Sequence, residues 1–255
     1  MDFTFPIEQG TLHVEYVKKK AGAPTIVFLH DALGAVQTWR AFPERLAERT
    51  DCNYLAYDRQ GHGKSSKLTQ QRDLDYLEVE ARVLLDLLEE FAIGRAILFG
   101  HSDGGSIALI AAAQLQNKLL GVITEAAHLF VEPLTLAGIK EAKGSYAKGK
   151  LRAKLVRYHG TKTDDLFYAW ADTWLADDFK DWNIEHLLPH ITCPCLAMQG
   201  KDDQFGSVKQ LQSIKNTHER NTIKLLDNIG HNPHKEQPHL VLELAADFIK
   251  NLKQR

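Results

Sequence analysis

The sequence predicts an α/β protein whose mostly parallel, twisted sheet carries helices on both faces. Two observations support this class: short apolar runs alternate with segments of helical periodicity, and one longer charged and aromatic segment interrupts the alternation. The composition agrees, because 255 residues can bury one sizeable core and 44% hydrophobic with 25% charged residues is ordinary for a soluble globular protein. A formal net charge of -2 gives no reason to expect a nucleic-acid partner.

The predicted elements follow one another in a regular order. Leu12–Val17 alternates as an exposed antiparallel strand would, and Thr25–Leu29 is continuously apolar, as expected of a strand covered on both faces. Further strands are predicted over Cys52–Tyr57, Ala96–Phe99, Leu120–Thr124, Pro194–Gln199 and Thr222–Leu226. Helices are predicted over Trp39–Glu48, Asp75–Phe91, Gly104–Leu115, Ser207–Lys215 and His239–Leu252.

Residues 130–184 interrupt this alternation with a helical pattern rich in charged and aromatic side chains. The sheet pattern resumes afterwards, so the segment is predicted to be a helical cap over the C-terminal edge of the sheet. Ligands bind at that edge in open α/β sheets. The core is therefore expected to comprise residues 1–129 and 185–255.

The chain shows no pattern of a secreted or membrane protein. Its first residues lack the basic and apolar regions of a secretory signal, and no apolar run approaches the roughly 20 residues needed to cross a bilayer. Three cysteines cannot form a disulfide framework, and the odd count fits a reducing compartment. We expect a cytoplasmic protein without a membrane partner.

A G-x-S-x-G motif, Gly100-His101-Ser102-Asp103-Gly104, lies between a predicted strand and a predicted helix. In that setting a strained turn exposes the serine as a nucleophile, whereas alone the glycines could merely join the two elements. A serine hydroxyl also needs a base and a carboxylate that orients it. Both types follow later strands in the expected chain order, as Gly200-Lys201-Asp202-Asp203 and Gly230-His231. The pattern predicts Ser102 as a nucleophile.

Five segments together make the chain resemble the α/β-hydrolase family over essentially its whole length: Phe28–Gly34, Tyr57–Ser65, Gly100–Gly105, Gly200–Asp203 and Gly230–Pro238. The resemblance implies the α/β-hydrolase fold, with the cap inserted after the sixth strand. It also implies a catalytic triad of Ser102, Asp203 and His231, with Asp202 the less favoured acid, and an oxyanion hole formed by the backbone N–H groups of Ala32 and Asp103.

One residue departs from the family's pattern. Asp31 follows His30 where the family usually has glycine. A backbone donor survives this change, but a carboxylate beside a developing oxyanion is unfavourable unless it points away or is paired. Asp103 raises the same question, although the helix N-terminus there would stabilise its charge.

Serine at the nucleophile position predicts acyl transfer to water through an acyl-enzyme, with no cofactor. No catalytic metal is expected, because His231, His234 and His239 form no ligand motif. The primary hypothesis is a serine carboxylic-ester hydrolase. A C–C bond hydrolase of the meta-cleavage type, a small-molecule lactonase and a degenerate receptor or scaffold without activity stay open as alternatives.

The cap supplies the clues to the substrate. Lys140–Lys162 contains eight basic residues and one acid, and Asp164–Glu185 contains seven acids and one basic residue. These charges could pair with one another on solvated helix faces, or the basic face could bind an anionic partner. Within the family, pimeloyl-carrier-protein methyl ester esterases of biotin synthesis use basic cap residues in this way, so the resemblance implies an acyl carrier protein docking on Lys143, Lys150, Arg152, Lys154 and Arg157. The tentative substrate pocket comprises Asp31, His128, Phe130, Trp170 and Trp174.

Overall fold

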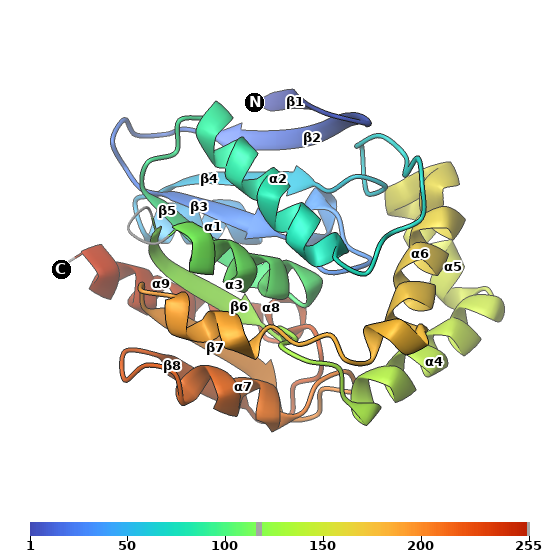
Figure 1. The fold of residues 1–255 in the computed structure, drawn as a ribbon. Helices are drawn as coiled ribbons and strands as arrows, with labels where there is room; N and C mark the ends of the chain where they lie inside the picture. The colour runs from blue at the N-terminus through green and yellow to red at the C-terminus, as the bar shows by residue number, and fades with distance from the viewer. Residues whose placement is uncertain (116–118, 254–255) are drawn as a thin grey trace.

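The computed structural model describes residues 1–115 and 119–253; residues 116–118 and 254–255 of the expected core lie outside the described part. Eight strands form one sheet in the order β1-β2-β4-β3-β5-β6-β7-β8 (Figure 1). Only β1 and β2 run antiparallel to their neighbours, so the predicted mostly parallel sheet is confirmed. The strands span Asp2–Ile7 (β1), Gly10–Val17 (β2), Thr25–Leu29 (β3), Asn53–Asp58 (β4), Ala96–His101 (β5), Leu119–Glu125 (β6), Cys195–Gly200 (β7) and Thr222–Leu226 (β8).

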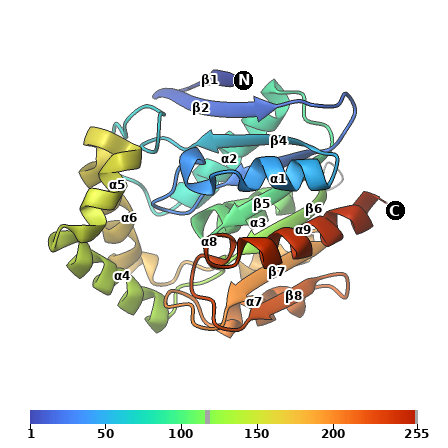
Figure 2. The ribbon, with the colours of Figure 1, turned by 180° about the vertical axis from the view of Figure 1, so that it is seen from behind.

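Helices cover both faces of the sheet. One face carries α2 and α3, which lie side by side in front of the sheet in Figure 1, together with α7. The opposite face carries α1 and α9, which are seen in front in Figure 2. These helices span Phe42–Arg49 (α1), Tyr76–Glu90 (α2), Asp103–Leu115 (α3), Val208–Lys215 (α7) and Pro238–Lys253 (α9), with the short α8 at Pro233–Glu236.

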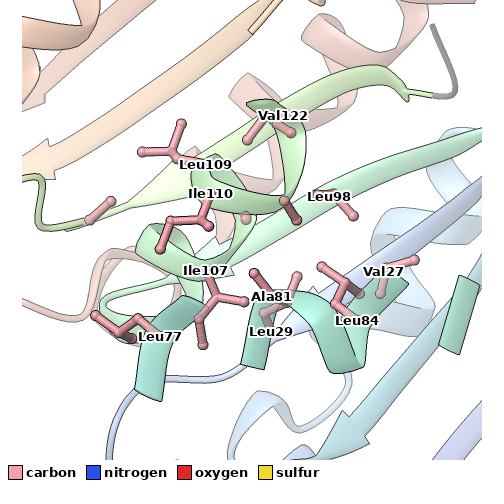
Figure 3. Close-up of a cluster of buried hydrophobic side chains, with 14 of the residues drawn as sticks. Val27, Leu29, Leu77, Ala81, Leu84, Leu98, Ile107, Leu109, Ile110 and Val122 are labelled. Atoms are coloured by element: carbon pink, nitrogen blue, oxygen red, sulfur yellow. The ribbon is translucent and has the colours of Figure 1, made fainter. Parts of the chain in front are cut away.

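The sheet separates two hydrophobic cores, which explains why the central strands are apolar at every position. In β3, Val27 and Leu29 face the core under α2 and α3, whereas Ile26 and Phe28 face the core under α1 and α9. Successive side chains of a strand point to opposite faces, so a strand covered on both sides needs apolar residues throughout. Figure 3 shows the first of these cores, with side chains from α2, α3 and the central strands.

Two elements differ from the sequence-based expectation. The strand β1 was not predicted, because it lies at the antiparallel edge of the sheet and Phe5 is its only buried residue. The helix expected over Trp39–Glu48 is divided into a 3₁₀ turn, Val36–Trp39, and α1, since Arg40 between them has a φ of 52°. Amphipathic spacing over Asp75–Phe91 predicts a buried stripe of Leu77, Leu84, Leu85 and Leu88, whereas in α2 Leu87 is buried and Leu85 is half-buried.

The cap contains three helices between β6 and β7: α4 (Pro133–Ala147), α5 (Lys150–His159) and α6 (Thr163–Leu175). They lie beyond the C-terminal ends of the parallel strands in both views of the ribbon (Figures 1 and 2). Tyr146 of α4 stacks on Phe167 of α6 with ring centroids 3.7 Å apart, which ties the first and last of these helices together. Of the helices that the structure describes, none is long and apolar enough to span a membrane.

The core around α2 generates a prediction about stability. Leu84 is fully buried in this core, so Leu84→Ala should lower the free energy of unfolding by about 2–5 kcal/mol, through lost burial and the cavity left behind. Leu85→Ala is the matched control, because the adjacent side chain is only half-buried and its loss should be clearly smaller. Urea denaturation of both variants measures the difference. Equal losses would contradict the orientation assigned to α2.

Candidate active site

Ser102 lies in a tight turn where β5 meets α3. Its φ of 54° is a left-handed conformation that strains a non-glycine residue, and its N–H donates to the carbonyl of Glu125 at 2.8 Å. The turn is possible only with glycine on either side: a Cβ on Gly100 would lie 2.1 Å from the carbonyl oxygen of Gly104, and one on Gly104 would lie 2.1 Å from that of Leu29. Close packing of α3 against the strands therefore holds the serine in place.

Three side chains form a continuous hydrogen-bonded line from this turn. The Oγ atom of Ser102 lies 2.9 Å from Nε2 of His231, and Nδ1 of His231 lies 2.9 Å and 3.0 Å from the two carboxylate oxygens of Asp203. All three residues are buried, whereas Asp202, the less favoured acid, is exposed. Loops after β5, β7 and β8 supply these residues, so the structure brings together the predicted nucleophile, acid and base.

The carboxylate of Asp203 is held in its ionised form. Burial alone would raise its pKa, but the charge and hydrogen bonds of His231, together with the N–H group of Phe205 at 2.8 Å, lower the pKa below its ordinary value. An ionised carboxylate accepts the Nδ1–H of His231 and leaves Nε2 free to receive a proton from Ser102. This is the arrangement of a general base paired with a nucleophile.

The loop that carries His231 is anchored at several points. Its carbonyl accepts a hydrogen bond from Nε2 of His101 at 2.7 Å, and Glu236 accepts from the backbone N–H groups on either side, at 2.8 Å and 3.0 Å. His234, three residues further on, is buried and lies 2.6 Å from a carboxylate oxygen of Glu125. His234 thus supports the loop from inside the protein and does not lie on the surface.

The two predicted oxyanion-hole residues line the same cavity as Ser102. Ala32 follows β3 and Asp103 begins α3. Within residues 1–115 and 119–253, neither backbone N–H group donates to another protein atom. Two unengaged donors beside a nucleophile are what an oxyanion hole requires.

The carboxylate of Asp31 is paired. One oxygen accepts the backbone N–H of Leu33 at 2.9 Å, and the other lies 3.3 Å from Nδ1 of His101 and 3.4 Å from Nζ of Lys235. Burial would raise the pKa of this carboxyl, but Lys235 and His101 together hold the pKa well below its usual range. The negative charge is therefore balanced locally, next to Ala32.

The carboxylate of Asp103 is also engaged. Oδ2 accepts a hydrogen bond from the hydroxyl of Tyr76 at 2.7 Å, and that hydroxyl accepts one from Nε1 of Trp174 at 2.8 Å. The guanidinium of Arg59 lies 3.9 Å from the same carboxylate oxygen, and both side chains are almost completely buried. The chain of bonds links the start of α3 to α2 and to the cap helix α6.

A cavity of about 620 Å³ lies between the cap and the C-terminal edge of the sheet, and Ser102 and His231 open into it. Of the tentative pocket residues, Asp31, His128, Trp170 and Trp174 line it. Phe130 does not: its backbone pairs with Asn183, and it borders a separate surface hollow near α7. Further apolar residues, unnoticed in the sequence as pocket residues, line the cavity: Leu33, Ile139, Ala142, Leu151, Leu155, Tyr158 and Phe205.

His128 forms a neutral, buried wall of this cavity. Its Nε2 lies 3.1 Å from the carbonyl oxygen of Phe205, and its backbone is bonded on both sides to the hydroxyl of Ser106. Burial, reinforced by nearby His231, lowers the pKa of His128, so the imidazole is uncharged.

The basic residues of the cap do not form one surface. Lys143 lies on α4, and a break at Gly149, with a φ of 85°, separates this helix from α5. The Lys143 side chain pairs with Asp172 at 2.6 Å. Helical spacing in the sequence would place Lys143 on one face with Lys150, Lys154 and Arg157, but the structure divides these residues between two helices. Arg152 pairs with Asp164, also at 2.6 Å. The remaining three, Lys150, Lys154 and Arg157, are exposed and make no ion pair with the residues that the structure describes.

No cluster of potential metal ligands adjoins the triad in the described part of the chain. The group that comes closest to metal-ligand spacing is Asp2, His13 and Glu15, on β1 and β2.

Known proteins resemble this chain in sequence and in fold. Residues 26–244 match the alpha/beta hydrolase family. Serine hydrolase BPHL of Homo sapiens is 25% identical, over 94% of this chain and 84% of that protein. The 2-succinyl-6-hydroxy-2,4-cyclohexadiene-1-carboxylate synthase of Salmonella paratyphi C is 32% identical, over 94% of this chain and 99% of that protein.

Two further comparisons extend this picture. A 2-hydroxy-6-oxononadienedioate/2-hydroxy-6-oxononatrienedioate hydrolase of Paraburkholderia phymatum is 29% identical, over 78% of each chain. Among solved structures, a bacterial membrane phospholipase A superposes with a TM-score of 0.82 at 20% identity, over 100% of this chain and 87% of that one. At this identity the structural match supports the fold only.

The sheet order, the strained turn after β5 and the buried line of three side chains define an enzyme of the hydrolase class. The chain belongs to the alpha/beta hydrolase family.

The pairing of Asp31 generates a prediction about pH. Asp31→Asn should destabilise the fold by about 1–3 kcal/mol at pH 7, because Lys235 and His101 lose a charged partner. A folded-state pKa below the unfolded value of about 3.9 adds stability above that pH and loses it as the pH falls. The difference in the free energy of unfolding between the wild type and the variant should therefore become smaller below about pH 4.

Denaturant titration at a series of pH values measures this gap. Asp202→Asn is the control, since that exposed carboxylate pairs with no described residue and its removal should change little. A gap that stayed constant down to pH 3 would show that the charge of Asp31 is not the source of the stability.

Proposed function

We propose that this protein is a serine carboxylic-ester hydrolase that works through an acyl-enzyme on Ser102. The observation that supports it most directly is the line of contacts from Ser102 to His231 to Asp203, with distances of 2.9 Å at each step, inside a cavity that also contains two unengaged N–H donors. Serine as the attacking group leads to acyl transfer.

The reaction follows from these positions. His231 takes the proton of Ser102 as Oγ attacks the ester carbonyl, and the N–H groups of Ala32 and Asp103 stabilise the oxyanion. Asp203 stabilises the imidazolium, which then protonates the departing alkoxide and leaves an acyl-enzyme. His231 next removes a proton from water, and the hydroxide releases the acid and restores Ser102.

This mechanism makes Ser102 indispensable. Ser102→Ala should lower kcat on p-nitrophenyl esters by at least about 10⁴-fold, because subtilisin loses about 2 × 10⁶ when its serine is removed. The unfolding transition should be essentially unchanged, as measured by circular dichroism. Ser145→Ala on the cap is the matched control, since this serine is exposed and remote from the triad. The activity of this variant should equal that of the wild type. A fluorophosphonate probe should label the wild type and not Ser102→Ala.

The relatives give a reason to test a second chemistry. One is named as a hydrolase of an oxo-dienedioate and another as a carboxylate synthase. A C–C bond hydrolase would turn over a vinylogous diketone and leave simple p-nitrophenyl esters intact, whereas a lactonase would prefer cyclic esters. Absence of both turnover and fluorophosphonate labelling would favour a receptor or scaffold without activity.

We further propose that the exposed basic face of α5 binds an acyl carrier protein, so that the ester is presented on a carrier arm. Support comes from Lys150 and Arg157, which are exposed and carry no ion pair in the described structure. The acid-rich segment of the cap neutralises Lys143 and Arg152 and leaves these two available. Carrier proteins are attracted to such a face by complementary charge.

Charge reversal tests this docking. Lys150→Glu together with Arg157→Glu should lower the ratio of kcat/KM for a carrier-bound methyl ester to that for the free ester by about tenfold or more, and 0.5 M salt should reduce the difference. Lys18→Glu with Lys20→Glu is the control, because these exposed lysines follow β2 at the opposite edge of the sheet. If charge reversal at Lys150 and Arg157 left the ratio of the two kcat/KM values unchanged, the proposed docking of a carrier protein would be wrong.

A further inference from the structure

The acidic side chains that line the catalytic cavity are all engaged with the protein itself. Asp31 pairs with Lys235 and His101, and both oxygens of Glu236 accept backbone N–H groups. Asp103 accepts the hydroxyl of Tyr76. The negative charges of the cavity therefore have local partners and do not need a cation from a ligand.

Of the three lysine and arginine side chains in the described lining, two are not balanced in this way. Lys235 is held by Asp31 and by Oδ1 of Asn232, at 3.4 Å and 3.0 Å. Arg40 and Lys154 also line the cavity, yet neither makes an ion pair with any residue in the described ranges. They belong to different parts of the protein, Arg40 to the turn before α1 and Lys154 to the cap helix α5.

Both residues are exposed, which places their charges at the mouth of the cavity. The contrast with the rest of the cap is informative, since Lys143 and Arg152 have acidic partners within 2.6 Å. Two exposed cations from separate elements that line one cavity without a counter-charge are suited to attract an anion.

The backbone at Arg40 supports a specific role for this residue. Its φ of 52° and ψ of −133° lie in a region that costs a non-glycine residue on the order of 1–3 kcal/mol. Buried Trp39 and Phe42 on either side fix the turn, and the N–H of Arg40 donates to the carbonyl of Gln37 at 3.2 Å. Glycine would relieve the strain, but it would remove the guanidinium from the cavity.

The interior of the cavity limits where an anion can sit. The lining of the cavity as a whole is more apolar than polar, with Leu33, Ile139, Leu151, Leu155 and Phe205 among its residues. An unpaired carboxylate loses several kcal/mol of hydration in such surroundings, so a charged group remains near the two cations. The uncharged ester is the part of the ligand that can enter and reach Ser102.

We propose that the enzyme acts on half-esters of dicarboxylic acids: Ser102 attacks the ester while Arg40 and Lys154 bind the free carboxylate at the cavity mouth. This inference rests on the proposed ester hydrolase function. It makes Arg40 and Lys154 specificity-determining residues, with the planar guanidinium able to bind both carboxylate oxygens.

The test compares two esters that differ only in charge, the monomethyl and dimethyl esters of one dicarboxylic acid. The wild type should favour the monomethyl ester by about tenfold or more in kcat/KM, equivalent to one charge-assisted contact. Arg40→Gln and Lys154→Gln should each reduce this ratio, and the double variant should bring it close to one. Arg45→Gln on α1 and Lys140→Gln on α4 are matched controls, because both are exposed basic residues that do not line the cavity.

Equal turnover of the two esters by the wild type, or a preference that survives in the double variant, would overturn the inference. The inference would also be overturned if the enzyme preferred acyl-phosphopantetheine to acyl-pantetheine but did not prefer the monomethyl ester to the dimethyl ester. The two cations at the mouth would then bind a phosphate group.

A binding measurement separates this inference from the proposed function. Calorimetry with Ser102→Ala protein should detect the monomethyl ester of the dicarboxylic acid but not the dimethyl ester, and the binding should be lost when Arg40→Gln and Lys154→Gln are added. If no ester is hydrolysed but this binding is found, the ester hydrolase proposal fails while the anion site stands. If an ester is hydrolysed through Ser102 and no such binding is found, the anion site fails while the ester hydrolase proposal stands.

Discussion

The strained turn at Ser102 is the constraint on which the remainder of the site depends. A left-handed residue between β5 and α3 brings the first turn of the helix so close to the strands that Gly100 and Gly104 have no room for a side chain. The energy of that strain is offset by α3, whose residues from Asp103 to Ala112 are all buried. The packed core therefore fixes the nucleophile, and the loops after β7 and β8 bring Asp203 and His231 to it.

The partners are themselves held by a second layer of polar contacts. His101, next to the nucleophile, bonds the carbonyl of His231 and also faces Asp31, so one buried ring joins the base, the nucleophile turn and the loop after β3. Burial lowers the pKa of His101, which keeps this ring neutral in spite of the carboxylate beside it. Misplacing one of these loops would disturb the others.

The two carboxylates beside the backbone N–H groups of Ala32 and Asp103 each have partners within the protein. The Asp31 carboxylate is paired with Lys235, and the Asp103 carboxylate, 3.9 Å from the guanidinium of Arg59, accepts a hydrogen bond from Tyr76. The second contact continues to Trp174 on the cap, so the wall of the substrate cavity and the start of α3 share one hydrogen-bonded chain. Asp31, in place of the usual glycine, thus adds a connection through Lys235 to the loop that carries His231.

The fold class, the two apolar faces of the sheet and the candidate nucleophile Ser102 were indicated by the sequence, because strand periodicity and the strand–turn–helix setting of Ser102 are local properties. Asp203 and His231 were expected only from the resemblance to a family. The tertiary structure decided which charges are paired, since Lys143 and Asp172 are far apart in the chain and only the packing of α4 on α6 brings them together. For the same reason Arg40 gave no local sign of its place at the cavity, and Phe130 was wrongly expected there. A sequence pattern reports on residues that are close in the chain, whereas contacts between residues distant in the chain are set by tertiary packing.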